Sequence, residues 1–188
     1  MPQSDTISPS DTKALRTVLG CYATGVAIVT THSPADGLIG VTINSFSSVS
    51  LEPPLILFSL SRSSNMLGSF QEAGSFVVNI LAFGQKELSN MFAKPSTASW
   101  AQTRYIQNAQ GCALLRESLA HMECTKTAEI DGGDHVIFLL RVDLFHLRES
   151  ADPLLFYRGR YGTYVCERLG KLPPADSALS DFSVSGWG

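Results

Sequence analysis

One segment of the sequence, GVTINSFSSVSLEPPL at residues 40–55, combines hydroxyl and amide side chains with a change of pattern. Val41 and Ile43 alternate with polar residues, as in a half-buried strand, and the alternation stops before the proline pair at 53–54. A break in a strand ladder leaves backbone N–H and C=O groups available. With side-chain hydroxyls, they suit a planar heterocycle that has donors and acceptors along its edge. A bulged strand whose hydroxyls face water is the alternative interpretation. The small polar residues are Thr42, Asn44, Ser45, Ser47, Ser48 and Ser50.

The composition is that of a globular chain without a basic surface. Its 188 residues, 44% hydrophobic and 16% charged, suit one domain with a substantial core. A net charge of -3 and the lack of any Lys or Arg block argue against a nucleic-acid partner. The N-terminus lacks an apolar run of signal-peptide length, and the longest apolar runs are too short to span a bilayer. We therefore expect a soluble cytoplasmic protein that does not bind membranes.

Several common motifs are missing from the sequence. There is no GxGxxG or GxxxxGK[ST] loop, so any nucleotide is not held in a Rossmann or P-loop manner. There is no G-x-S-x-G elbow, which argues against a serine hydrolase. The four cysteines form no CxxC pair, which implies neither a metal site nor a disulfide scaffold but free thiols in a reducing compartment. They are Cys21, Cys112, Cys124 and Cys166.

The hydrophobic pattern predicts many short strands and few helices. Ser10 or Asp11 is expected to cap a helix over 12–23, and residues 94–111 are expected to form a long loop. The other helices are predicted at 61–74, with Ser63 or Ser64 near its start and Gly74 at its end, and at 84–93. This pattern favours a closed or nearly closed antiparallel barrel. The predicted strands cover 25–31, a stretch beginning at Leu38, 55–60, 75–81, 119–130, 134–147, 153–157 and 160–165.

The order of several blocks makes the sequence recognisable. TGVAIVTT, GVTINSFSSVSLEPPL, SFVVNIL, LSNMFA, GDHVIFLLRV and PLLFYRGRYGTY follow one another between about residues 12 and 166. Together they resemble the short-chain flavin reductases, the NAD(P)H:flavin oxidoreductases that serve two-component monooxygenases. The resemblance implies an FMN-binding split β-barrel, Greek-key-like and antiparallel, that forms a homodimer. We expect a flexible arm at 1–11, the reductase domain at 12–168 and a peripheral tail at 169–188.

The resemblance also implies which residues meet the cofactors, FMN or FAD and NADH or NADPH. The serine segment would line the isoalloxazine and ribityl chain, while Ser61, Ser64 and a helix start would receive the flavin phosphate. His135 of the GDH block at 133–135 is expected on the nicotinamide side, as the residue nearest to a catalytic role. The remaining expected cofactor contacts are Thr42, Ile43, Asn44, Ser45, Phe46, Ser47, Ser48, Ala82, Phe92, Lys94, Arg158, Arg160 and Tyr161.

The implied reaction passes hydride from nicotinamide C4 to flavin N5, and reduced flavin then serves a separate oxygenase component. Arg158 and Arg160 would meet the pyrophosphate, and Tyr161 would stack on the dinucleotide. A non-enzymatic FMN-binding protein of the same fold is the main alternative. A second alternative is a relative that acts on pyridoxal phosphate or haem. The chain is poor in basic phosphate ligands, which argues against it. For several positions an ordinary structural role is the competing interpretation: helix capping by the serines, a solvated Lys94, a structural His135.

Overall fold

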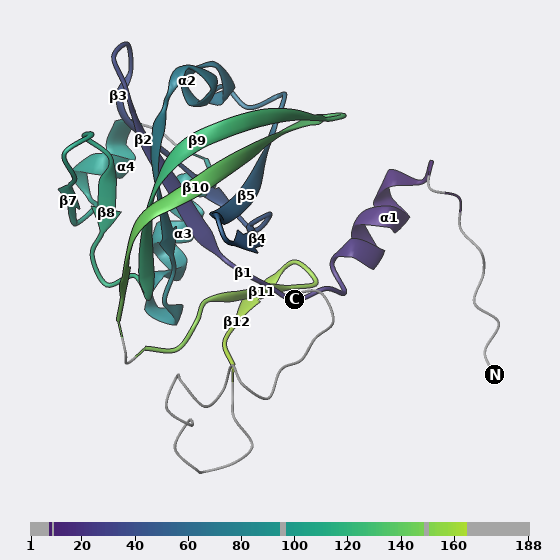
Figure 1. The fold of residues 1–188 in the computed structure, drawn as a ribbon. Coiled ribbons are helices and arrows are strands. Elements are labelled where there is room, and N and C mark those ends of the chain that lie inside the picture. The colour runs from purple at the N-terminus through teal and green to yellow at the C-terminus, as the bar shows by residue number, and fades with distance from the viewer. Residues whose placement is uncertain (1–7, 9, 95–96, 149–150, 165–188) are drawn as a thin grey trace.

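A seven-stranded antiparallel sheet forms the body of the molecule in the computed structural model, which describes residues 8, 10–94, 97–148 and 151–164 (Figure 1). Every pairing between neighbouring strands is antiparallel. Within the described residues no pairing joins the two outer strands, so the curved sheet is a split rather than a closed barrel, as predicted. The strands in spatial order are β3 (Gly37–Ile43), β2 (Ala27–Ser33), β6 (Ser75–Ile80), β9 (Ala120–Gly132), β10 (His135–Leu147), β5 (Pro54–Ser61) and β4 (Ser47–Leu51).

Aromatic side chains fill the interior of this sheet. Phe58 of β5 and Phe138 of β10 stack with ring centroids 4.9 Å apart, and Phe70 and Phe76 meet them edge-on or tilted. All four rings are fully buried, and burial of such large apolar surfaces is the main force that stabilises a domain of this size. The alternation of buried and half-buried residues along β5 is the period-two pattern of its sequence.

Smaller elements surround the main sheet. A three-stranded sheet lies beside the helix α1, and a two-stranded sheet covers another part of the barrel (Figure 1). None of the helices in the described part of the chain is long and apolar enough to cross a membrane. The remaining elements are β1 (Thr24–Gly25), β11 (Leu155–Tyr157), β12 (Arg160–Gly162), β7 (Tyr105–Gln107), β8 (Ala113–Leu115), α1 (Thr12–Leu19), α2 (Leu67–Glu72), the 3-10 helix η1 (Phe83–Gln85), α3 (Lys86–Ala93) and α4 (Thr97–Ala101).

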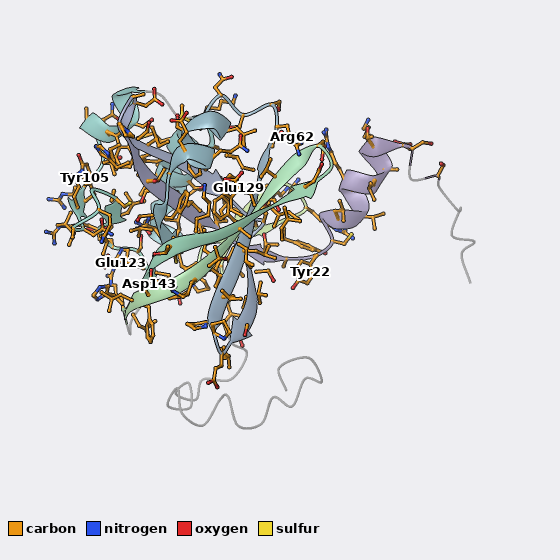
Figure 2. The ribbon with its side chains drawn as sticks, turned by 45° about the horizontal axis from the view of Figure 1, so that its top comes forward. Tyr22, Arg62, Tyr105, Glu123, Glu129 and Asp143 are labelled. Atoms are coloured by element: carbon orange, nitrogen blue, oxygen red, sulfur yellow. The ribbon has the colours of Figure 1, made fainter. Side chains whose placement is uncertain are left out.

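The helix α1 begins as predicted but ends at Leu19 and not at residue 23, and it projects from the barrel. The Asp11 carboxylate accepts hydrogen bonds from the backbone N–H groups of Lys13 and Ala14, which caps the helix. The apolar face of α1, with Val18 and Leu19, stays exposed, and so does Tyr22 just beyond the helix (Figure 2). Within the described chain these apolar side chains therefore lie outside the hydrophobic core.

Two further sequence predictions are wrong. The segment 94–111 is not one long loop, because it contains α4 and β7, and β8 follows it. Trp100 anchors this region, with ring centroids 4.8 Å from Phe92 and 5.3 Å from Tyr105. The helix expected over 61–74 covers only Leu67–Glu72, so Ser63 and Ser64 precede it, and Gly74 does not close it because Ala73 is already extended. Elements this short have too few turns to show a hydrophobic period.

Candidate functional site

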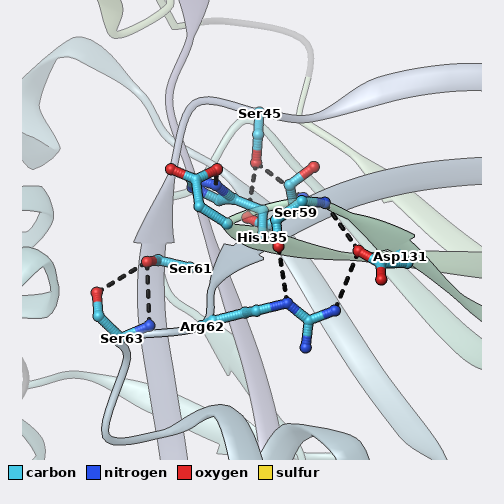
Figure 3. A network of polar contacts seen from close by, with 9 residues as sticks. Ser45, Ser59, Ser61, Arg62, Ser63, Asp131 and His135 are labelled. Atoms are coloured by element: carbon cyan, nitrogen blue, oxygen red, sulfur yellow. Dashed lines mark hydrogen bonds and ion pairs between the residues drawn. The ribbon is translucent and has the colours of Figure 1, made fainter. Parts of the chain in front are cut away.

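The serine segment is a break between two strands. β3 ends at Ile43 and β4 begins at Ser47, where it pairs with Leu57 of β5. If the β4–β5 register continued, Ser45 would lie opposite Ser59. The Ser45 side chain instead makes the hydrogen bonds that the backbone of a strand would make there. The Ser45 Oγ donates to the Ser59 carbonyl oxygen and accepts from the Ser59 N–H, each at 3.0 Å (Figure 3). The polar groups of β5 are thereby satisfied while residues 44–46 stay outside the strands.

A cavity of about 200 Å³ opens beside this break. The Thr42 Oγ1 donates to the Ser89 carbonyl oxygen at 2.7 Å, and the Ser89 hydroxyl lies 2.9 Å from the Tyr161 hydroxyl. This chain of contacts joins β3, α3 and β12 around the opening. Its lining combines apolar side chains with the polar Thr42, Asn44 and Tyr161, which suits a planar aromatic ring with a hydrogen-bonding edge. The lining residues are Val26, Thr42, Ile43, Asn44, Ala93, Phe156 and Tyr161.

The rest of the serine segment points elsewhere. Phe46 is half-buried and packs against the main core. Ser47 and Ser48 are exposed on the outer strand β4, where the Ser47 hydroxyl donates only to the neighbouring Ser48 carbonyl. A shift of register between Ser48 and Ser50 marks the predicted bulge. The segment therefore divides into residues that line the cavity, Ser45 that supports the break, and hydroxyls that face solvent.

A larger cavity of about 540 Å³ adjoins the first at Tyr161, which lines both. Arg158 and Arg160 line it with Tyr157, in the turn that joins β11 to β12. The Arg158 guanidinium lies 5.4 Å from the centre of the Tyr157 ring and donates to the Cys21 sulfur at 3.3 Å. Arg158 has φ of 47°, a conformation that is costly outside glycine and shapes this turn. The turn thus brings the two arginines and Tyr161 to the lining of one cavity.

His135 lies at the start of β10, directly opposite Ser61 of β5. Ser59 and Ser61 are two residues apart and so share one face of β5, which places His135 near the break supported by Ser45 (Figure 3). The His135 Nδ1 is 2.7 Å from the Asp134 Oδ1, and His135 holds the pKa of the exposed Asp134 carboxyl below its ordinary value. The contact with Asp134 orients the imidazole at the turn of the β9–β10 hairpin.

Arg62 fastens the turn that carries His135. Its Nε donates to the Gly133 carbonyl oxygen at 2.8 Å, and its backbone N–H donates to the Asp134 carbonyl oxygen at 2.9 Å. The guanidinium also pairs with Asp131 at 3.2 Å (Figure 3). The backbone N–H of Gly133, followed by Arg62, lowers the pKa of the Asp131 carboxyl. Sequence reasoning missed Arg62 because its partners are about 70 residues away in the chain.

The other predicted residues lie around rather than in the cavities. Ala82 is buried, and its N–H donates to the Gln85 side chain at 2.9 Å. Phe92 is 0% exposed within the core against Trp100, and its neighbour Ala93 lines the first cavity instead. Lys94 is exposed at the end of α3.

Ser61 and Ser64 form a turn, in which the Ser64 N–H donates to the Ser61 carbonyl oxygen at 3.0 Å. The helix start expected beside them is therefore replaced by this turn. Val26, Phe156 and Ala93 were missed as lining residues, because small or apolar side chains in strands and helices carry no chemical signal of their own. Their only sequence signal was membership of the recognised blocks at 24–31, 88–93 and 153–164.

An antiparallel barrel whose two outer strands do not pair within the described residues belongs to the split-barrel class of fold. The chain belongs to the flavin reductase like domain family, whose pattern it matches over residues 19–164. It is 40% identical over 153 residues to a probable flavin reductase of Rhizobium meliloti (strain 1021), covering 81% of this chain and 49% of that relative. The chain therefore spans about half the length of this relative.

Two further comparisons cover more of the matched protein. The reductase subunit of a flavin-dependent monooxygenase from Rhodococcus jostii (strain RHA1) is 39% identical over 80% of this chain and 77% of its own. The solved NADH:FAD oxidoreductase of Streptomyces globisporus C-1027, in complex with NAD and FAD fragments, is 31% identical with a TM-score of 0.82. That likeness covers 87% of this chain and 99% of the other.

Proposed function

We propose that this protein is an NAD(P)H:flavin oxidoreductase that supplies reduced flavin to a separate monooxygenase. The observation that carries the proposal is the cavity at the break between β3 and β4, in a chain of the flavin reductase like family. Relatives named as reductase components of flavin-dependent monooxygenases, in Rhodococcus jostii and in Acinetobacter baylyi, support the role of the partner oxygenase.

The residues of the cavity fit an isoalloxazine ring. Val26, Ala93 and Phe156 offer apolar faces, while Thr42 and Asn44 offer polar groups. The backbone of residues 44–46 lies outside the strands, and this leaves it available to the edge of the ring. Ile43 and the backbone of residues 44–46 complete the proposed flavin contacts, Ser45 acts through its bonds to Ser59, and the solvent-facing Ser47 and Ser48 lie outside this cavity. Phe92 packs in one core cluster with Val26 and Phe156 of the cavity, whereas Ala82 is buried outside that cluster.

The nicotinamide dinucleotide would lie across the larger cavity. Arg158 and Arg160 are exposed cations suited to its pyrophosphate, and Tyr161 is shared with the flavin cavity, which would bring the two rings together. His135, oriented by Asp134, is proposed to position the nicotinamide or its ribose. The bound cofactors supply the chemistry of hydride transfer, and the protein's task is to hold the two reacting atoms about 3–3.5 Å apart.

The flavin phosphate is proposed to meet the turn at Ser61 and Ser64, and the exposed Lys94 is proposed as its counter-charge. The Ser61 hydroxyl lies 2.9 Å from that of Ser63, so a small cluster of donors is already gathered there. Hydroxyls and backbone N–H groups in a turn bind phosphate without needing a helix. This departs from the helix-start interpretation, since α2 begins only at Leu67.

A homodimer is part of the proposal. α1 extends away from the barrel and presents an exposed apolar face with no partner element in the described chain (Figure 1). An exposed patch of this kind is typical of an interaction surface. The apolar patch comprises Leu15, Val18, Leu19 and Tyr22.

A reducing cytoplasmic location is also proposed. The free thiols of the described residues, Cys21, Cys112 and Cys124, agree with it.

The experiment that tests the proposal follows NADH or NADPH oxidation by its absorbance, under air, after addition of FMN or FAD to the purified protein. Flavin-dependent oxidation is expected, and the four cofactor pairings identify the preferred pair. Relatives named as an NADH-dependent FMN reductase and as an NADH:FAD oxidoreductase favour NADH. Bound flavin without oxidation of either nicotinamide would instead support the alternative, a non-enzymatic FMN-binding protein.

A further inference from the structure

A third cavity, of about 560 Å³, lies away from the residues assigned to flavin and nicotinamide. We name it the β8–β10 cavity: it lies between the β7–β8 sheet, residues 116–119 and the adjoining ends of β9 and β10. In Figure 2, Tyr105 and Glu123 mark this side of the molecule, whereas Arg62 marks the other end of the β9–β10 hairpin. It shares no lining residue with the two cavities at Tyr161. Its size falls within the ~300–1,000 Å³ usual for small-molecule sites.

Two guanidinium groups line the β8–β10 cavity. Arg148 follows β10, and its Nη1 donates to the Glu117 carbonyl oxygen at 2.9 Å, which anchors the side chain at the wall. Arg116 lies on the segment between β8 and β9. Within the described ranges no carboxylate forms an ion pair with either arginine, because Glu117 pairs with Arg104 instead. Guanidinium groups bind carboxylates through two parallel hydrogen bonds.

Ser118 belongs to the wall of the cavity but does not offer its hydroxyl to it. The residue is 2% exposed, and its Oγ is itself buried and has no hydrogen-bond partner among the described residues. The polar groups available to a ligand in the cavity are therefore those of the two arginines.

The remaining wall is apolar, and the polar groups near it are already engaged. The His121 Nε2 donates to the Leu115 carbonyl oxygen at 2.7 Å, and burial lowers the pKa of this imidazole, so it adds no charge. Glu117 at the wall and Glu123 beside His146 limit the positive charge, which favours a monoanion over a phosphate dianion. The apolar lining residues are Ile106, Leu114, Leu115, Leu119 and Leu147.

We propose that the β8–β10 cavity binds a small organic acid. Its carboxylate lies between Arg116 and Arg148, and its apolar body packs against the leucines. This inference does not depend on the proposed reductase activity, since the site is separate from the cofactor cavities.

Calorimetric titration of the purified protein with benzoate tests the inference, with benzyl alcohol as the neutral probe and acetate as the probe without an apolar body. Benzoate is expected to bind saturably, and both controls far more weakly. Arg116→Gln and Arg148→Gln should each weaken benzoate binding about tenfold, a loss that titration resolves well, whereas Ser118→Ala should leave it unchanged because the Ser118 Oγ is buried. Arg141→Gln is the matched control, because Arg141 pairs with Asp143 and lies outside the cavity. Ser118→Ala should not lower the melting temperature, since it removes an unpaired buried hydroxyl.

Three results would overturn the proposal. The first is the absence of saturable benzoate binding to the unaltered protein. The second is equal affinity in all four variants, or equal affinity for benzyl alcohol, which would remove the arginines from the site. The third is displacement of benzoate by FMN, which would place the acid in the flavin cavity instead.

Discussion

Replacing Ser45 with alanine tests whether this hydroxyl holds the strand break together. The Ser45 Oγ makes two hydrogen bonds of 3.0 Å to the Ser59 peptide groups, at a partly buried position. Each such bond contributes ~1 kcal/mol, so Ser45→Ala should lower the free energy of unfolding by about 2 kcal/mol. For a domain of this size the melting temperature should fall by about 4–8 °C.

The matched control is Ser47→Ala, two residues away in the same segment. Ser47 is exposed and its hydroxyl donates only to the adjacent Ser48 carbonyl, so the expected change is below about 0.5 kcal/mol. Urea unfolding of the wild type and the two variants, with a common slope, gives the comparison. Equal losses for both variants, or no loss for Ser45→Ala, would refute the assignment of Ser45 to the support of the break.

Three further predictions concern packing, pH and cofactor binding. Gly40→Ala should lower the free energy of unfolding by ~1–3 kcal/mol, because its Cβ would lie 3.2 Å from two atoms of the buried Phe92 ring. Gly68→Ala is the control and should not lower it, because there is open space around Gly68. Denaturant unfolding measures both variants. Burial lowers the pKa of His121 below its ordinary value of 6.5, so the unfolded chain takes up the proton first, and stability should fall as the pH drops below about 6.5. His121→Gln should flatten this dependence, and an unchanged slope would contradict the burial argument. His135→Ala should raise the KM for the nicotinamide more than that for flavin, and steady-state kinetics showing equal effects would return His135 to a structural role.

Much of the architecture could be predicted because its strands are long or have clear patterns. The alternation along β5 and the long apolar runs of β6 and β10 are visible in the sequence, and the Asp11 cap follows from local chemistry. The prediction of a long loop over 94–111 failed because α4 and β7 have only five and three residues and are fixed by the contacts of Trp100. No local pattern reports a contact of that kind.

The site could be predicted only in part, for a related reason. The loss of alternation after Ile43 does mark the strand break, and the YRGRYG block does form a turn beside a cavity. The different structural roles of the serines are not visible in the sequence, because Ser45 differs from Ser47 only through its register with Ser59. Arg62 was missed since its role depends on a turn that is distant along the chain. The expected arm at 1–11 and tail at 169–188 lie largely or wholly outside the described residues, and the domain limits remain predictions.

The most direct test of the central claim is an anaerobic rapid-mixing measurement in which NADH is added to the protein preincubated with flavin. The account predicts that the visible absorbance of oxidised flavin disappears in a protein-dependent phase, and that the His135→Ala variant requires more NADH to reach the same rate. Flavin that binds to the protein but keeps its oxidised spectrum in the presence of excess NADH or NADPH would contradict the assignment of a reductase.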